Sequence, residues 1–423
     1  MSFRVISRSV VGPAALPLLV ALVYMLPINL NIGSFSGKPI DLAISNIILV
    51  VSIFLFFGSH RLSKLAFTGL VLPFFFISIG LISALLRGGD LAVVFSALSF
   101  TIPVFHIGAG YVIGRSSMNF SFLNISFALS LVILAIFLSD IAYGSFPRGC
   151  GIEGRLGGCL GQFEVYGFPN SSMNFLAICS PMLALPFIRR SKVSWRILAL
   201  FAFIALSVMV PLSLSRSALL VFSLSLGFIV MIIFGIFALF AYLSIAILLI
   251  ASFQWVISLH LFSGIAARMR VALEADNLSN GRTEIWKDAI SIWLESPLLG
   301  KAFVPFSEYS MFGTAHQQYL EILYKTGLLG FTFYFGYLLI VARLANRLIR
   351  SDIKRSTNDQ QVFFAFGTCI FVSNLFQPSI SYQPMGNFMF FALGVFLARS
   401  AANIKVTNET NPSEFIHRAV RTG

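Results

Sequence analysis

Long apolar runs separated by short polar stretches dominate the chain, and this pattern predicts its secondary structure. Each run is long enough for a helix to cross a bilayer, and the runs do not alternate residue by residue as the strands of a membrane barrel would. We therefore expect an all-α polytopic membrane protein with about 12 transmembrane helices. The twelve runs span residues 10–31, 41–58, 64–86, 91–114, 119–142, 170–188, 194–214, 217–235, 237–260, 317–342, 361–380 and 386–402.

Residues 217–260 form one apolar stretch that is too long for a single crossing. We divide it at Gly235 into a helical hairpin with almost no loop. The composition agrees with the membrane assignment, since the chain is 57% hydrophobic and only 11% charged. Soluble domains carry roughly 25% charged residues, so they are excluded.

Lys and Arg residues set the expected orientation. With the N-terminus inside, most of the 29 basic residues fall on the inner side of the membrane, as the positive-inside rule requires. Both termini are then cytoplasmic, and two long polar loops at 143–169 and 261–315 face outward. The net charge of +13 therefore reports membrane orientation, and we expect no nucleic-acid partner.

The expected organisation is one membrane domain over residues 1–402, which includes both outer loops, and a cytoplasmic tail over residues 403–423. The start MSFRVISR followed by an apolar run resembles a signal peptide. Pro13, Pro17 and Pro27 and the missing small-residue cleavage site favour a retained first helix instead.

Arginine collects on the outer side, against the positive-inside trend. A single such residue, for example Arg216 in SLSRSALL, is explained by a side chain that reaches from a helix end to the interface. Several together could bind an anionic ligand, because guanidinium is well suited to phosphate oxygens. Both explanations stay open for the following residues: Arg148, Arg155, Arg216, Arg268, Arg270 and Arg282.

The second outer loop contains a predicted amphipathic helix. In NGRTEIWKDAISIWLESPLLGKAF, apolar residues recur at helical spacing from Thr283 until Pro297 ends the helix. Trp286 and Trp293 share one face, so we expect the helix to lie on the outer leaflet with both rings at headgroup depth. Arg282 falls in its first turn.

His316 is the histidine best placed for chemistry. It ends the arginine-bearing loop and begins an apolar helix, whereas His106 stands alone within a predicted helix, where we expect a hydrogen-bonded structural residue. Glu321 and Lys325 follow in the favourable i, i+4 order and are expected to neutralise each other at shallow membrane depth. Gly327 is expected to allow close helix packing below them.

The sequence gives little support for a metal site. No two histidines stand at ligand spacing and no CxxC is present. Glu274 and Asp276 form an acid-x-acid pair of a kind that is common by chance. Cys150 and Cys159 share one outer loop, so a disulfide between them stays open. We expect no cofactor and no metal.

Three motifs resemble the O-antigen ligase and Wzy-type O-antigen (exopolysaccharide) polymerase superfamily, whose members are multi-spanning glycosyltransferases. They are Arg216 in SLSRSALL, Arg282 in a Gly-Arg…Trp…Pro-Leu-Leu-Gly pattern, and His316-Gln317 followed by nine residues and then Gly327 and Gly330. A fainter fourth motif is Arg155 with GFPNSSM. Lys301 departs from the pattern, which often has Gly there. The likeness covers residues 150–342.

The resemblance implies a GT-C-like helical fold and glycan transfer from undecaprenyl diphosphate on the periplasmic face of the bacterial inner membrane. The implied roles are His316 as the base for the attacking hydroxyl, Arg216, Arg282 and Arg155 as diphosphate ligands, and Gln317, Tyr319 and Glu321 as supporting residues. Cations can stabilise the leaving diphosphate without a general acid. We therefore expect an inverting, metal-independent reaction.

The motifs do not separate a polymerase, which extends glycan on a second lipid diphosphate, from a ligase, which moves glycan to lipid A core. The tryptophan-rich loop looks closer to the polymerase branch, so polymerisation of a surface polysaccharide is the first expectation and ligation the alternative. Expected partners are the lipid-linked donor, a lipid-linked or lipid A core acceptor, the bilayer and a chain-length regulator.

A flippase or another twelve-helix transporter is the alternative from a different class. Such a protein would show two similar halves and ionisable residues at mid-membrane. The sequence shows no similarity between its halves, and its ionisable residues gather at the outer face.

Overall fold

The computed structural model describes most of the chain, and the account below is confined to those residues. They are 15–26, 29–35, 38–50, 75, 77–86, 91–115, 120–143, 159–160, 163–164, 169–213, 215–251, 281–351, 358–378, 380 and 382–410.

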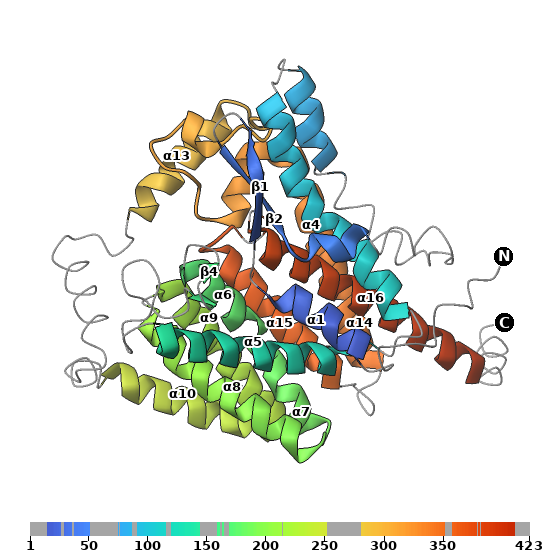
Figure 1. Ribbon diagram of the computed structural model, residues 1–423. Helices are drawn as coiled ribbons and strands as arrows, with labels where there is room; N and C mark the ends of the chain where they lie inside the picture. The colour runs from blue at the N-terminus through green and yellow to red at the C-terminus, as the bar shows by residue number, and fades with distance from the viewer. Residues whose placement is uncertain are drawn as a thin grey trace.

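The described chain is built mainly of helices (Figure 1). Their bounds are α1 (Ala15–Met25), α4 (Leu91–Arg115), α5 (Phe122–Tyr143), α6 (Pro169–Cys179), η2 (Ser180–Ala184), α7 (Leu185–Ile188), α8 (Val193–Leu212), α9 (Arg216–Phe234), α10 (Ile236–Ala251), α13 (Arg282–Leu294), η4 (Phe306–Glu308), α14 (Gln318–Ser351), α15 (Asn358–Asn374) and α16 (Gln383–Thr410). In Figure 1, α5, α8 and α10 lie at the bottom, and α13 lies above the helical body.

Two short antiparallel hairpins accompany the helices. Strand β1 (Asn29–Phe35) pairs with β2 (Lys38–Ala43), and β3 (Cys159–Leu160) pairs with β4 (Phe163–Glu164). The first hairpin corrects the end of the expected helix at 10–31 and the start of that at 41–58, because α1 ends at Met25 and strand occupies residues 29–31 and 41–43. Pro27 lacks a backbone N–H and disfavours helix in the residue before it, which explains the stop. Residues 46–50 are helical as expected.

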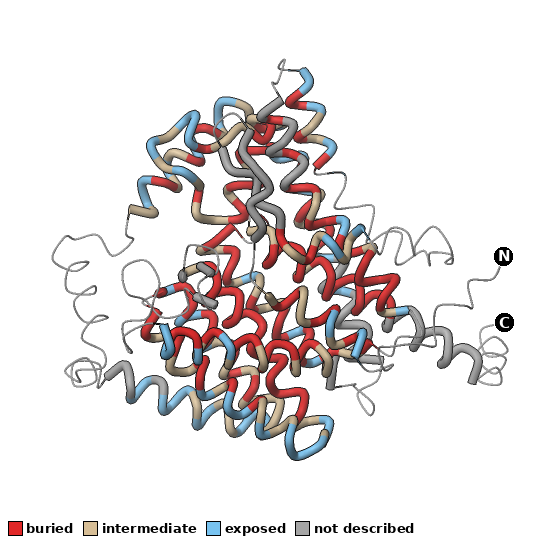
Figure 2. Tube along the Cα trace, viewed as in Figure 1, coloured by how far each residue is buried: buried red, intermediate tan, exposed pale blue. Residues whose placement is uncertain are grey.

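The helices agree with a multi-pass membrane protein. Within the described ranges, four helices are long and apolar enough to cross a membrane: Phe122–Tyr143, Asn170–Ile188, Val193–Leu212 and Arg216–Phe234. Many apolar side chains of α8 and α10 are exposed, and buried residues gather in the centre of the body (Figure 2). An apolar surface of this kind suits contact with lipid. The total of twelve spans, the side of each terminus and the GT-C likeness remain predictions.

The predicted division of the long apolar run is confirmed. Helix α9 ends at Phe234 and α10 begins at Ile236, with Gly235 between them at φ 87°. The Gly235 N–H donates to the Met231 carbonyl at 2.9 Å. Glycine adopts this left-handed backbone without the steric cost that a side chain would add, so a single residue suffices for the break.

Helices α4 and α16 approach more closely than side chains would allow. A Cβ atom added to Gly110 would lie 2.0 Å from the Phe391 carbonyl oxygen, and one added to Gly394 would lie 2.1 Å from the Ile107 carbonyl oxygen. The two glycines therefore let the backbones touch, as small residues do in membrane helix pairs.

A buried polar network beside this contact ties α1 and α16 to α4. The Tyr24 hydroxyl bonds His106 Nδ1 at 2.5 Å, and His106 Nε2 lies 3.1 Å from Asn46 Oδ1. Asn387 Nδ2 donates to the same oxygen at 2.8 Å. Because a carbonyl oxygen only accepts, Nε2 must carry the ring proton and Nδ1 must accept from Tyr24. The structural role expected for His106 is confirmed.

We predict that Gly110→Ala destabilises the protein by about 1–3 kcal/mol, because the new methyl group collides with backbone that cannot move without separating α4 from α16. Thermal unfolding of the purified protein in detergent would measure this. Gly108→Ala is the matched control, since a Cβ atom at Gly108 meets nothing within 4 Å. Equal unfolding temperatures for the two variants would contradict the proposed contact.

Candidate active site

The loop after α13 and the helix α14 exchange backbone hydrogen bonds. Helix α14 is broken at Gly327, which has φ 66° and ψ −170°. In an unbroken helix Leu328 N–H would donate to the Tyr324 carbonyl. Instead it donates to the Pro297 carbonyl at 2.8 Å, and the Tyr324 carbonyl accepts from Lys301 N–H at 2.6 Å. The loop thus supplies hydrogen-bond partners that one turn of the helix would otherwise supply.

A second pair of bonds is exchanged in the same way. Leu329 N–H donates to the Leu298 carbonyl at 3.2 Å, and the Lys325 carbonyl accepts from Ala302 N–H at 2.9 Å. All four groups at the break stay hydrogen-bonded, so the kink leaves none of them unsatisfied in an apolar environment. Residues 297–302 thus provide the hydrogen-bond partners that the broken helix lacks.

Two glycines make this exchange possible. A Cβ atom on Gly327 would lie 2.2 Å from the Leu298 carbonyl oxygen, and one on Gly300 would lie 2.5 Å from the Gly327 nitrogen. The expected role of Gly327 in helix packing is therefore corrected, because its close contact is with the loop. This contact joins the Pro-Leu-Leu-Gly motif to the Gly-x-x-Gly motif.

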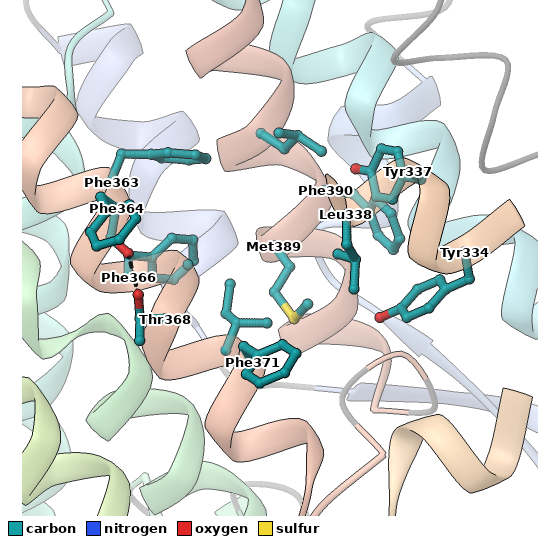
Figure 3. A pocket seen from close by; sticks show the side chains of 13 residues that line it. Tyr334, Tyr337, Leu338, Phe363, Phe364, Phe366, Thr368, Phe371, Met389 and Phe390 are labelled. Atoms are coloured by element: carbon teal, nitrogen blue, oxygen red, sulfur yellow. Dashed lines mark hydrogen bonds between the residues drawn. The ribbon is translucent and has the colours of Figure 1, made fainter. Parts of the chain in front are cut away.

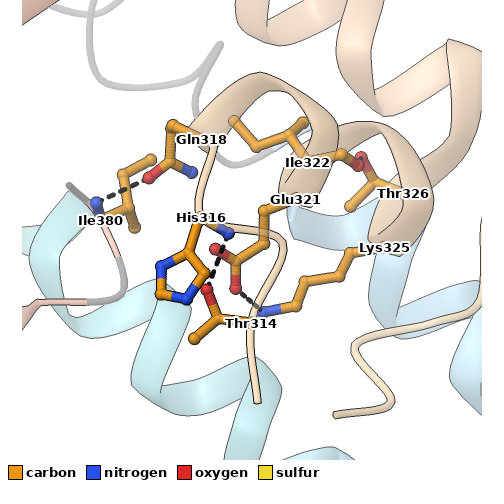
Figure 4. Close-up of polar contacts among 8 residues, drawn as sticks. All are labelled: Thr314, His316, Gln318, Glu321, Ile322, Lys325, Thr326 and Ile380. Atoms are coloured by element: carbon orange, nitrogen blue, oxygen red, sulfur yellow. Dashed lines mark hydrogen bonds and ion pairs between the residues drawn. The ribbon is translucent and has the colours of Figure 1, made fainter. Parts of the chain in front are cut away.

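His316 lies two residues before α14, on a constrained turn (Figure 4). Its φ is 49°, a left-handed conformation that is uncommon outside glycine, and its N–H donates to Thr314 Oγ1 at 2.9 Å. The buried Gln318 accepts a bond from Ile380 N–H at 2.8 Å, which fixes the helix start to the chain before α16. Strained backbone held by its surroundings is characteristic of functional sites.

Arg216 and Arg282 each begin a helix. Arg216 is the first residue of α9, where Ser215 Oγ accepts from Ala218 N–H at 3.4 Å. Gly281 turns the chain at φ 77° into α13, whose first residue is Arg282. The partial positive charge of a helix N-terminus therefore adds to each guanidinium charge. The Arg282 guanidinium also lies 5.8 Å from the centre of the Phe376 ring.

Arg282 lies within electrostatic range of both Arg216 and His316. Burial, and then the Arg216 charge, lower the pKa of the Arg282 guanidinium. Burial, and then the Arg282 charge, lower the pKa of His316, while Glu321 acts in the opposite direction. The imidazole is therefore neutral at pH 7 and able to accept a proton, beside two cations that favour an anionic ligand.

Glu321 and Lys325 form the expected ion pair. Lys325 Nζ lies 2.6 Å from Glu321 Oε1, and both side chains are buried. The ammonium group also lies 4.3 Å from the centre of the Phe100 ring, which adds a cation–π contact. Figure 4 shows the Glu321 carboxylate on the same side of this turn as the His316 ring. The carboxylate thus faces both the imidazole and the amine.

Helix α13 is placed as predicted, but its apolar face is directed differently. Ile285, Ala289 and Ile292 are buried in a cluster that includes Tyr324 of α14. Trp286 and Trp293 pack against the same cluster. Both rings are only partly buried, and their expected depth in the outer leaflet remains a prediction. Packing on α14 holds Arg282 against the site.

Several predicted residues lie outside the described ranges, and their assignments stay predictions. They are Arg148, Arg155, Arg268, Arg270, Glu274, Asp276 and Cys150. Gln317 is partly buried, and the Tyr319 hydroxyl donates to the Phe371 carbonyl at 3.0 Å. Among the described residues no group of three or more His, Cys, Asp or Glu could hold a metal ion.

The sequence reasoning missed the chain between α15 and α16. Phe376 lies beside Arg282, and the Ile380 N–H donates to the Gln318 side chain. Both residues lie in LFQPSISYQP, of which we assigned the first six residues to the apolar segment 361–380 and the rest to the short gap after it. Its two prolines and two serines were the available signal for a loop that contacts the site.

Comparison with known proteins supports the resemblance. A family model described as O-Antigen ligase matches residues 171–335. The match contains Arg216, Arg282 and His316 and excludes Arg155, and it confirms the resemblance read from the motifs. No curated protein matches the chain.

We predict that Gly300→Ala destabilises the site by at least about 1 kcal/mol, because Gly300 has φ 68° and its Cβ atom would strike the α14 backbone. Hydrogen exchange of the Leu328 and Leu329 amides should speed up, since their loop acceptors move away. Gly313→Ala, in the same loop but with open space around it, is the control. Unchanged exchange in Gly300→Ala would contradict the account of the kink.

Proposed function

We propose that this protein is an integral-membrane glycosyltransferase that transfers glycan from undecaprenyl diphosphate on the periplasmic face of the bacterial inner membrane. The observation that supports this best is the meeting of Arg216, Arg282 and His316, three residues from distant parts of the sequence. All three lie in the segment that the O-antigen ligase model matches.

The two arginines suit a diphosphate leaving group. Breaking the bond between the anomeric carbon and the diphosphate oxygen leaves an electron pair, and therefore negative charge, on that oxygen. Hydrogen bonds from guanidinium to such an oxygen contribute about 1.5–3 kcal/mol each. Because both cations are already in place, they stabilise the developing charge without a proton donor.

His316 suits the role of general base. The acceptor hydroxyl would attack the anomeric carbon from the face opposite the diphosphate and form the new glycosidic bond. Its proton would pass to the neutral imidazole. Attack opposite to the leaving group inverts the configuration at that carbon, and no step requires a metal. Arg155 is proposed as a further diphosphate ligand on the strength of its motif alone.

Glu321 suits a supporting role in this scheme. Its charge raises the pKa of His316 against the two lowering influences, and would stabilise the imidazolium as it forms. Tyr319 supports the site by joining α14 to α15 through its hydroxyl. Gln317 lies between His316 and the first helical residue and completes the proposed set.

Two acceptors fit the same chemistry. Transfer to a second lipid diphosphate makes the protein a polymerase of a surface polysaccharide, which the tryptophan-rich loop favours. Transfer to lipid A core makes it a ligase, which the description of the matching family model favours. Deletion of the gene distinguishes them: a single repeat unit on lipid A core identifies the polymerase, and unattached long glycan identifies the ligase.

We predict that His316→Ala, Arg216→Ala and Arg282→Ala each abolish glycan formation in the deletion strain, because each removes one part of the transfer chemistry. Gel profiles of the surface glycan, with immunoblots for expression, would measure the effect. Arg196→Ala, on the first turn of α8, is the control and should restore normal glycan. Normal glycan from any of the three site variants would sink the corresponding assignment.

The lowered pKa of His316 predicts a specific pH dependence. Neutral imidazole is the active form, so kcat/KM should fall only at pH values below the ordinary histidine pKa of about 6.5. Folding stability should also decline as the pH falls through 6.5, because the unfolded chain takes up the proton that the folded state resists. A kcat/KM profile with its acidic limb at or above pH 6.5 would exclude His316 as the base.

A further inference from the structure

An apolar cavity of about 300 Å³ lies between α14, α15 and α16 (Figure 3). Tyr334, Tyr337 and Leu338 line it from α14, a stretch from Phe363 to Phe371 lines it from α15, and α16 adds Met389, Phe390 and Leu393. None of the lining residues carries a charge. The cavity is therefore suited to a hydrocarbon ligand.

Two hydroxyls of the lining differ in their hydrogen bonding: among the described residues the buried Tyr337 hydroxyl has no hydrogen-bond partner, whereas Thr368 is bonded to its own helix. The Thr368 hydroxyl donates to the Phe364 carbonyl of its own helix at 3.0 Å, as the dashed line in Figure 3 marks. Phe364 and Phe371, by contrast, are 46% and 47% exposed. Half-exposed aromatic rings beside an apolar cavity give it an open side, which faces lipid if the surrounding helices cross the membrane.

The cavity adjoins the proposed active site. The Phe371 carbonyl accepts the Tyr319 hydroxyl, three residues beyond His316. Phe376, whose ring contacts Arg282, follows five residues after Phe371. Helix α15 ends at Asn374, so Phe371 lies in its last turn and Phe376 just beyond its end. A diphosphate bound by the arginines would thus have its attached chain at the mouth of the cavity.

We infer that this cavity holds the first isoprene units of the lipid-linked donor. The inference rests on the proposed function and assigns the part of the substrate that the arginines and His316 do not contact. A phospholipid acyl chain is the other hydrocarbon available in a bilayer. The isoprenoid is favoured because its diphosphate end is the group for which the adjoining site is charged.

Gly367 offers a way to fill the cavity without disturbing the fold. It lines the cavity, and a Cβ atom at this position meets nothing within 4 Å. Gly367→Leu therefore places a branched side chain where the isoprenoid would lie. Gly336→Leu is the matched control, since Gly336 lies on α14, has the same open space and does not line the cavity.

The kinetic test uses purified full-length protein and two donors with the same glycan diphosphate, one on undecaprenol and one on a single isoprene unit. Gly367→Leu should raise KM for the long donor at least about tenfold, as steric loss in an apolar pocket does. It should change KM for the short donor much less and leave kcat unaltered. Gly336→Leu should behave as wild type. Equal KM for Gly367→Leu and wild type with the long donor would overturn the inference.

A binding test separates this inference from the proposed function. A prenyl diphosphate with a photoreactive diazirine, free of glycan, should label the peptides that contain 363–371 or 389–393, and His316→Ala should be labelled equally. Gly367→Leu should lose most of the label and Gly336→Leu should keep it. Labelling with normal turnover in His316→Ala would reject the catalytic scheme and retain the lipid site. Equal labelling by a diazirine phospholipid would overturn the isoprenoid assignment.

Discussion

The exchange of backbone hydrogen bonds at Gly327 is the constraint on which the site depends. A helix that breaks in apolar surroundings must find new partners for the amides and carbonyls at the break, because those surroundings offer none. Here the Pro297–Ala302 segment supplies two acceptors and two donors. The loop that follows α13, the helix that Arg282 begins, is thereby fixed to the helix that follows His316. Main-chain hydrogen bonds therefore hold a cation and an imidazole from separate elements in a fixed relative position.

The charged side chains of the site differ in how their neighbours stabilise them. Burial, and then the Arg216 charge, lower the pKa of the Arg282 guanidinium, and an anion bound beside it would stabilise the charged form. Lys325 is stabilised within the fold by Glu321 and the Phe100 ring.

Structural features that depend on nearby residues were predictable from the sequence. The hairpin at Gly235, the start of α13 at Arg282 and the Glu321–Lys325 pair depend on residues within a few positions of one another. The β1–β2 hairpin was missed because its outer ends overlap apolar runs that hydropathy assigns to helix, and the chain between those runs was taken for a loop. The packing of α13 on α14 was missed because amphipathicity identifies an apolar face but not its partner. Nothing local indicated that Phe376 would meet Arg282, since that contact depends on tertiary packing.

The break at Gly327 divides α14 into two parts with different surroundings. Its first part, from Gln318 to Thr326, carries the ion pair and follows His316 directly. Its second part carries Tyr334, Tyr337 and Leu338 along the apolar cavity. A straight helix would hold both parts on one axis, whereas the turn at Gly327 lets each take its own direction. Gly300 and Gly327, which admit the loop, therefore allow the proposed reaction centre and the proposed hydrocarbon site to be adjacent on one element. A substrate with a charged head and an apolar chain needs that adjacency.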